Sequence, residues 1–260
     1  MGIITINFKG VKVGTFSESY IFAEDKIVTG IFINSTGTKL WMVGSQFDNV
    51  YAYTFSTAWD VSTLTYDSKL LSVLSEDRIP TGVWFKPDGT EMYVIGSIGN
   101  EIHTYILSTA WDVSTGTYSS TKDISANTSN PARPYFNVTG TKMFIVNQQP
   151  NPDTINEYSL TSWDMSTLTY VGSWVSPTSN SIGGITFDSS GLSMYISDKL
   201  NDSIEKYTLS TAYDISTAIN VSTVDISAEQ SSPGAPFIKT DNSKMIISGQ
   251  SPSGVFGYNL

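Results

Sequence analysis

The sequence is first informative through what it lacks. Its 260 residues include no cysteine and only one histidine, which excludes a disulfide framework and a thiolate metal site. Charged residues make up 15% of the chain and form no Lys/Arg cluster, so nucleic acid is not an expected partner. The net charge of −10 is expected to serve solubility. No phosphate-binding loop or metal-ligand spacing occurs, so no cofactor and no metal are expected.

Long apolar runs are also absent. No stretch reaches the roughly 18 apolar residues of a membrane span, so membrane insertion is not expected. The first ten residues lack the charged start and long apolar run of a signal peptide. Residues 1–10 match nothing later in the chain, and their apolar residues alternate at Ile4, Ile6 and Phe8. They are predicted to form an N-terminal arm or an extra strand.

The chain does contain a repeat of about 50 residues, the signal that sets the architecture. Its clearest copy, residues 85–96, reads as a strand, a tight Asp-Gly turn and a second strand. The turn residue recurs at steps of 52, 51, 51 and 51 residues, at Gly37, Gly89, Gly140, Gly191 and Asn242. Glycine and asparagine are the residues that best tolerate the positive φ of such a turn. A long apolar residue opens each second strand, and a tyrosine recurs in each third strand (Tyr53, Tyr105, Tyr158, Tyr207 and Tyr258).

Each repeat predicts four short antiparallel strands, which is the blade of a β-propeller. The last repeat ends at Leu260 without a fourth strand, and residues 15–22 match the fourth-strand position of the other repeats. The N-terminal strand is therefore predicted to complete the last blade beside residues 255–259, which closes the ring and removes an exposed edge. We predict an all-β, five-bladed propeller that forms a single domain over residues 11–260.

The most repeated polar feature is the loop Ser-Thr-Ala-Trp-Asp-Val-Ser-Thr, at residues 56–63 and 108–115, with variants at 160–167 and 210–217. In a structural interpretation, Asp caps the turn and Trp packs between blades. In a functional one, each loop is a sugar site with an aromatic platform and a carboxylate. A duplicated blade needs identical linkers, which favours the structural interpretation. The candidate ligand-binding residues are Trp59, Asp60, Trp111, Asp112, Trp163, Asp164, Tyr213 and Asp214.

Arg133 is a further candidate, because the equivalent positions of the other repeats hold Gly or Ala. It would either meet an anionic ligand or plug the channel. A propeller glycosidase needs paired carboxylates at its channel. The residues that follow the first strands supply only one, Asp188, and the single histidine, His103, lies on a third strand. No catalytic residue and no enzymatic activity are therefore predicted.

Residues 86–94 (Lys-Pro-Asp-Gly-Thr-Glu-Met-Tyr-Val) and 104–115 (Thr-Tyr-Ile-Leu-Ser-Thr-Ala-Trp-Asp-Val-Ser-Thr) resemble propeller repeats of the YVTN and WD-repeat type. The Ser-Thr-Ala-Trp-Asp-Val-Ser-Thr variant resembles repeats of marine bacteriophage and bacterial proteins. With this resemblance, the leading hypothesis is a non-enzymatic virion component, in a phage tail or on a capsid surface, which binds other structural proteins or a host surface. A homo-oligomer and a cell-surface glycan are further expected partners.

Two alternatives stay open. One is a multivalent lectin, secreted or at a cell surface, that uses the Trp-Asp loops; the five-blade count resembles tachylectin-type lectins. The other is a glycosidase- or lactonase-like hydrolase.

Overall fold

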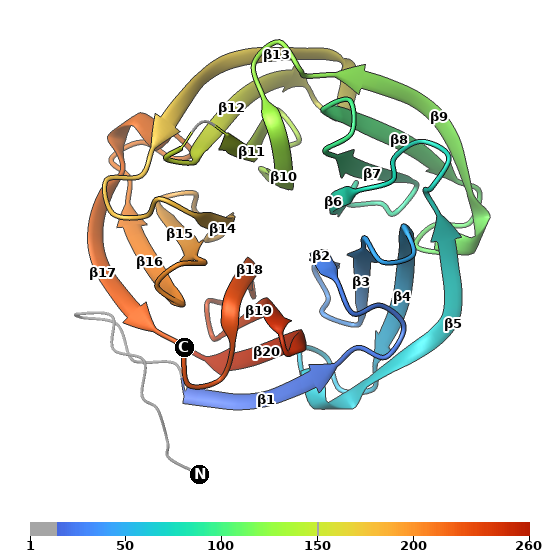
Figure 1. Cartoon of the computed structure of the whole chain (residues 1–260), viewed down its shortest axis with the longest axis horizontal. Helices are drawn as coiled ribbons and strands as arrows, with labels where there is room; N and C mark the ends of the chain where they lie inside the picture. The colour runs from blue at the N-terminus through green and yellow to red at the C-terminus, as the bar shows by residue number, and fades with distance from the viewer. Residues whose placement is uncertain (1–14, 150) are drawn as a thin grey trace.

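A computed structural model describes residues 15–149 and 151–260, and these form five four-stranded antiparallel sheets. The sheets are arranged as blades around a central channel, with the first strand of each blade innermost (Figure 1). The predicted five-bladed β-propeller is thereby confirmed. Among the described residues, no helix has the length and apolar character needed to cross a bilayer.

In every blade the four strands follow one another from the channel outward. Blade 1 holds β2 (Val28–Ile33), β3 (Lys39–Gly44), β4 (Asn49–Phe55) and β5 (Leu64–Ser72). Blade 2 holds β6 (Pro80–Phe85), β7 (Glu91–Gly96), β8 (Glu101–Leu107) and β9 (Gly116–Asp123). Blade 3 holds β10 (Ser129–Phe136), β11 (Lys142–Gln149), β12 (Thr154–Thr161) and β13 (Asp164–Val175). Blade 4 holds β14 (Ile182–Phe187), β15 (Ser193–Asp198), β16 (Ser203–Thr208) and β17 (Ile219–Asp225). Blade 5 holds β18 (Ser231–Ile238), β19 (Lys244–Ser251), β20 (Ser253–Asn259) and β1 (Thr15–Ile21). Short 3-10 turns η1 (Val61–Thr63), η2 (Val113–Thr115) and η3 (Ile215–Thr217) precede the outer strands of blades 1, 2 and 4.

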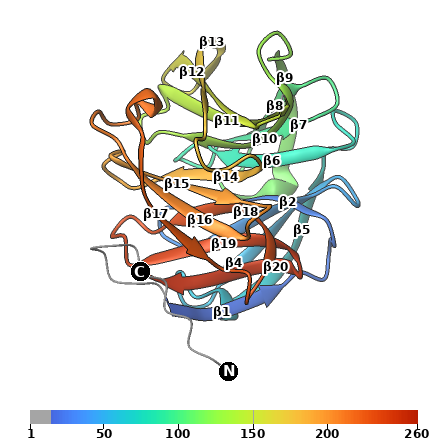
Figure 2. The ribbon, with the colours of Figure 1, turned by 60° about the vertical axis from the view of Figure 1, so that its left-hand side comes forward.

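The two ends of the described chain share blade 5. Strand β1 pairs antiparallel with β20, and Phe16 faces Tyr258 while Tyr20 faces Val255. Figure 2 shows the two strands side by side at the edge of the ring. The predicted closure of the ring by residues 15–22 is confirmed. The arm predicted at residues 1–10 lies outside the described residues.

The repeated turn residues have the positive φ that the sequence predicts, between 58° at Asn242 and 74° at Gly89. The glycines have a second function, since an aromatic ring packs directly on them. A Cβ added to Gly89 would lie 2.4 Å from the Trp111 ring, and Gly37, Gly140 and Gly191 are covered in the same way by their own loop aromatics. Blade 5 takes its outer strand from the other end of the chain and carries no such loop among the described residues, which explains why a side chain is tolerated at Asn242.

The repeated tyrosines join each blade to the loop that enters it from the preceding blade. The Tyr53 hydroxyl donates to Glu24 Oε2 at 2.7 Å, and the Tyr105 hydroxyl donates to Glu76 Oε2 at 3.0 Å. Both rings are buried, and burial raises the pKa of both tyrosines far above its usual range. The hydroxyls therefore stay protonated donors, and each one fixes an entering loop against its blade.

The hydrophobic core lies between neighbouring blades. Phe32 and Trp41 of blade 1 pack with Phe85, Met92 and Val94 of blade 2 in one buried cluster. The position that opens each second strand is fully buried, as predicted, with exposed fractions of 0 to 2% for Leu40, Met92, Met143, Met194 and Met245. Each blade thus buries both of its faces, which is why the second strands are almost entirely apolar.

Gly89→Ala tests the double function of the turn glycine. The change forces a Cβ both into a left-handed backbone and into the Trp111 ring, so we expect the free energy of unfolding to fall by about 2 kcal/mol or more. Gly172→Ala is the matched control, because a Cβ there meets nothing within 4 Å. Urea unfolding of both variants measures the difference, and equal stabilities would contradict the packing of Trp111 on the turn.

Candidate functional site

The channel has two chemically different ends. We call the end with the hairpins between first and second strands the turn end, and the end where loops enter the blades the crossover end. The Trp-Asp loops and Asp188 belong to the turn end, because they meet the hairpin turns. Arg133 lies in the middle of β10, and its guanidinium binds the carbonyls of Thr29 and Gly183 near the starts of β2 and β14, on the crossover side.

In all four Trp-Asp loops the aspartate caps the turn. Asp60 Oδ1 accepts from the Ser62 backbone N–H at 3.0 Å and from the Ser62 hydroxyl at 2.6 Å. Asp112, Asp164 and Asp214 bind their own serines in the same way. The hydrogen bond from the Ser62 hydroxyl is the main cause that lowers the pKa of Asp60. These contacts are those of the structural interpretation.

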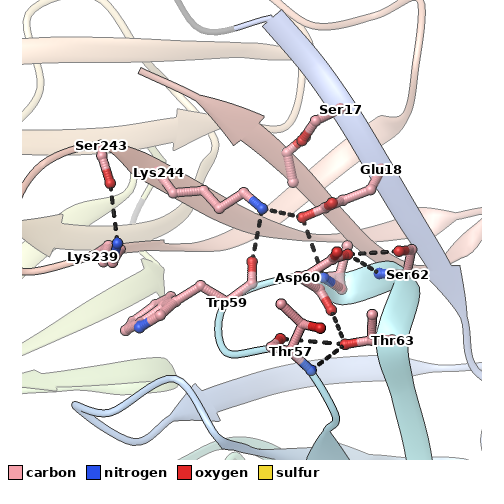
Figure 3. A network of polar contacts seen from close by, with 12 residues as sticks. Ser17, Glu18, Thr57, Trp59, Asp60, Ser62, Thr63, Lys239, Ser243 and Lys244 are labelled. Carbon is pink, nitrogen blue, oxygen red and sulfur yellow. Dashed lines mark hydrogen bonds and ion pairs between the residues drawn. The ribbon is translucent and has the colours of Figure 1, made fainter.

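The aromatic residues of the same loops pack between blades. The Trp111 ring stacks on Trp41 of blade 1 with ring centroids 5.2 Å apart, and on Phe85 of its own blade at 5.8 Å. In Figure 3, Lys244 of blade 5 lies between Glu18 and the Trp59 carbonyl of blade 1, to which it donates at 2.9 Å.

The carbonyls of Trp163 and Tyr213 likewise accept from the preceding blade, from Tyr93 and Lys142, both at 3.3 Å. Three of the four loops thus connect two blades through a backbone carbonyl. The use of these loops as separate sugar sites stays a prediction.

Asp188, the acidic residue expected nearest the channel, also has a structural function. Its Oδ1 accepts from the backbone N–H groups of Leu192 and Ser193, both at 3.2 Å. Asn34 and Asn137 form the equivalent hairpin bonds in blades 1 and 3. Of the residues that line the turn-end cavity, Asp188 is the only one with an acidic side chain. The paired carboxylates of a glycosidase are therefore not found among them.

Arg133 lies across the channel. A bulge separates its neighbours Ala132 and Pro134, and its φ is 47°, whereas none of the equivalent Gly30, Gly82, Gly184 and Ala235 has a positive φ. Its Nε donates to the Thr29 carbonyl at 2.9 Å and its Nη1 donates to the Gly183 carbonyl, so it bridges blades 1 and 4. No described carboxylate lies within 4.0 Å of the guanidinium, and burial lowers its pKa to about 10.

Three polar side chains and one backbone N–H group meet residues 181–183, around the start of β14 at the crossover end. Arg133 binds the Gly183 carbonyl, the Gln148 amide binds the Ile182 carbonyl at 3.4 Å, and Asp153 Oδ2 accepts from the Ile182 N–H at 2.8 Å. The backbone N–H of Lys199 donates to the Ser181 carbonyl at 2.9 Å. We call Arg133, Gln148, Asp153 and Lys199 the crossover cluster.

The pKa values of the titratable groups in the crossover cluster are shifted from their usual ranges. Burial, with the charge of Arg133, lowers the pKa of Lys199 to about 8 although Asp153 and Asp198 oppose the shift. Burial raises the pKa of Asp153, while the Ile182 N–H and Lys199 oppose that rise. Lys199 has no described ion-pair partner within 4.0 Å. Perturbed groups that converge at a channel mouth are typical of functional sites.

His103 belongs to a different, buried contact in blade 2. Its exposed fraction is 2%, its Nδ1 lies 2.9 Å from the Thr121 hydroxyl, and its Nε2 lies 4.0 Å from Asp77 Oδ2. Neither Nε2 nor Asp77 Oδ2 has a hydrogen-bond partner among the described residues. Burial lowers the pKa of His103, although Asp77 and Glu101 oppose the shift.

Comparisons with known proteins identify the fold but no family. No family model matches the chain, and no curated protein matches it. Several solved structures do match the chain. The β-propeller domain of Cps50 (Swd1) from Myceliophteria thermophila superposes with a TM-score of 0.55 at 9% identity, over 95% of this chain and 99% of that domain. A candidate 6-phosphogluconolactonase from Bacteroides uniformis superposes with a TM-score of 0.53 at 13% identity, over 95% of this chain and 74% of that one. The periplasmic gluconolactonase of Pseudomonas aeruginosa gives 0.51 at 13%, over 80% of this chain and 55% of that one. Structural similarity at sequence identities this low establishes only that the chain has the propeller fold.

These neighbours overturn the leading functional prediction. The predicted non-enzymatic virion component is wrong: two of the three proteins carry lactonase names and none is a virion or tail protein. Asp153 and Lys199 stand in loops whose residue types differ from blade to blade, and only the burial of Lys199 beside Arg133 reveals its perturbed pKa.

The buried His103 predicts a pH-dependent stability. The pKa of His103 in the folded chain lies below 6.5, its ordinary value in an unfolded chain. At pH values between these two pKa values, the unfolded chain binds a proton at His103 that the folded chain does not. The free energy of unfolding therefore falls as the pH drops below 6.5, by about 1 kcal/mol for each pKa unit of the shift. In His103→Gln this titration is absent. Urea unfolding at about pH 7.5 and about pH 5.5 should thus show a smaller loss for the variant, and parallel losses would contradict the assignment.

Proposed function

We propose that the chain is a hydrolase that opens small cyclic esters of hydroxylated acids, with the crossover cluster as its active site. The observation that carries the proposal is that the Arg133 and Asp153 side chains bind residues 182 and 183, while Lys199 interacts with both of their charges and has a pKa of about 8. The lactonase names of two structural neighbours support the class of reaction. The resemblance of the repeat to the YVTN and WD-repeat type agrees with the propeller fold but does not indicate which reaction the chain catalyses.

Ester hydrolysis needs a base near neutral pH, and Lys199 meets that requirement. A general base is most effective when its pKa lies near the working pH. An ordinary lysine is protonated there, whereas burial and the charge of Arg133 leave much of Lys199 as the free amine at pH 8. In this proposal the Lys199 amine accepts a proton from the attacking water while the water oxygen bonds to the carbonyl carbon of the lactone.

The oxyanion that then develops requires positive hydrogen-bond donors. Arg133 uses Nε and Nη1 on the Thr29 and Gly183 carbonyls, and no described carboxylate neutralises its charge. The guanidinium N–H groups that remain can donate to the oxyanion, and donors in a water-poor site stabilise such charge strongly. When the ring C–O bond breaks, the Lys199 ammonium returns its proton to the leaving alkoxide oxygen. The products are one hydroxy acid and the regenerated amine.

Asp153 and Gln148 are suited to bind the hydroxyl groups of such a substrate. Oδ2 of Asp153 accepts a hydrogen bond from the Ile182 N–H, and the amide nitrogen of Gln148 donates to the Ile182 carbonyl. Each has another oxygen with no described hydrogen-bond partner. Fixed acceptors favour ligands that offer hydroxyl donors, because an analogue without them would leave these groups unpaired.

Lactone hydrolysis by the purified chain tests the proposal. With D-glucono-δ-lactone and its 6-phosphate as substrates, acid release above the spontaneous rate should increase with pH through about 8, as Lys199 loses its proton. Lys199→Met should lower kcat/KM by at least about 100-fold, the usual contribution of a general base. Lys122→Met is the matched control on the outer strand β9 and should leave the rate unchanged. A wild-type rate equal to the uncatalysed rate, or an active Lys199→Met, would reject the assignment.

A further inference from the structure

A cavity occupies the turn end of the channel, and none of the residues of the crossover cluster lines it. Its volume is about 280 Å³, and it is lined by residues from all five blades. Trp59, Trp111 and Trp163 of the repeated loops contribute to its wall, together with the last residues of the inner strands. The Trp-Asp loops thus contribute to one common cavity. Its size is close to the lower limit of about 300 Å³ for small-molecule sites.

The innermost layer of this cavity is an incomplete aromatic ring. The equivalent positions of the five inner strands hold Phe32, Trp84, Tyr135, Thr186 and Phe237. Trp84 is central, since its ring centroid lies 5.0 Å from Phe32, 5.2 Å from Tyr135 and 5.8 Å from Phe237. Only blade 4 departs from the pattern, and Thr186 there places a small hydroxyl residue where the other blades place rings.

The only charged side chain that lines the cavity is acidic and belongs to blade 4. Among its lining residues only Asp188, also on blade 4, carries a charge, and no hydrogen bond engages its Oδ2. The lysines at the equivalent positions are held in ion pairs: Lys86 with Glu91 at 3.0 Å, and Lys239 with Asp241 at 2.8 Å. Neither lysine lines the cavity. Aromatic faces carry a negative quadrupole, so rings and carboxylate together make the cavity attractive to a cation.

We propose that this cavity binds a small organic cation, an ammonium group with apolar substituents. The rings of Phe32, Trp84 and Phe237 surround the apolar substituents, and the Asp188 carboxylate provides the opposite charge. Thr186 supplies a hydroxyl for a polar group of the ligand on the same side. The cavity is separate from the lactone site, since Arg133 binds backbone carbonyls across the channel between the two ends.

Binding of choline tests the proposal, with 3,3-dimethylbutan-1-ol as its uncharged isostere. Isothermal titration of the wild-type chain, with tryptophan fluorescence as a second signal, should detect choline and should find the isostere at least about tenfold weaker. Equal affinities would show a merely apolar cavity and reject the cation. The absence of choline binding would reject the proposal as well.

Two variants keep the fold and remove one feature each. Thr186→Phe introduces the type of residue that blades 1 and 5 already carry at this position, so it should fold and fill the cavity, with loss of choline binding. Thr223→Phe on the outer strand of the same blade is its control. Asp188→Asn keeps the hairpin bonds that Asn34 and Asn137 form elsewhere, and should weaken choline by about tenfold. Its control is Asp123→Asn on the surface of β9. Unchanged binding in either cavity variant would overturn the proposal, and neither result depends on lactone hydrolysis.

Discussion

Closure of the ring by the pairing of β1 with β20 is the constraint on which the other features depend. Five blades in a closed ring bring the inner strands so close that a Cβ on Gly30 would lie 2.8 Å from the Gly82 backbone. That spacing limits the channel, places backbone carbonyls where Arg133 can bridge them, and forces the aromatic side chains of four blades into mutual contact. With β20 as an open edge, neither channel end would have its present shape, and the edge itself would be a site of aggregation.

The fold was predictable because each of its requirements recurs in every blade. A turn with positive φ requires Gly or Asn, and the Asn242 exception falls in the blade without an aromatic loop over the turn. The repeated tyrosine marks the buried hydroxyl that fixes an entering loop, and the repeated aspartate marks a cap. Such local requirements leave a periodic trace in the sequence. The missing fourth strand of the last repeat even predicts which distant segment completes it.

The candidate site was only partly predictable, for a physical reason. Arg133 was recognisable as the one departure from Gly or Ala, yet its acceptors, the Thr29 and Gly183 carbonyls, are backbone groups that no sequence pattern identifies. Asp153 and Lys199 lie in loops that differ from blade to blade, and their pKa shifts arise from burial, which depends on the assembled ring. The aromatic residues of the turn-end cavity do recur in the sequence, two residues after Gly82 and after its equivalents in blades 1, 3 and 5. Their significance emerges only when five strands face one axis.

A symmetric scaffold acquires a specific function where its symmetry is broken. Five equal blades would present a ligand with five equal contacts, which cannot orient an asymmetric molecule. In this propeller each channel end has its own departure. Arg133 gives blade 3 a charge that reaches blades 1 and 4, and Thr186 removes a ring from blade 4 beside the single carboxylate of that cavity. The repeated residues thus account for the stability of the ring, whereas the exceptions to the repeat supply the directional chemistry on which both proposed sites depend.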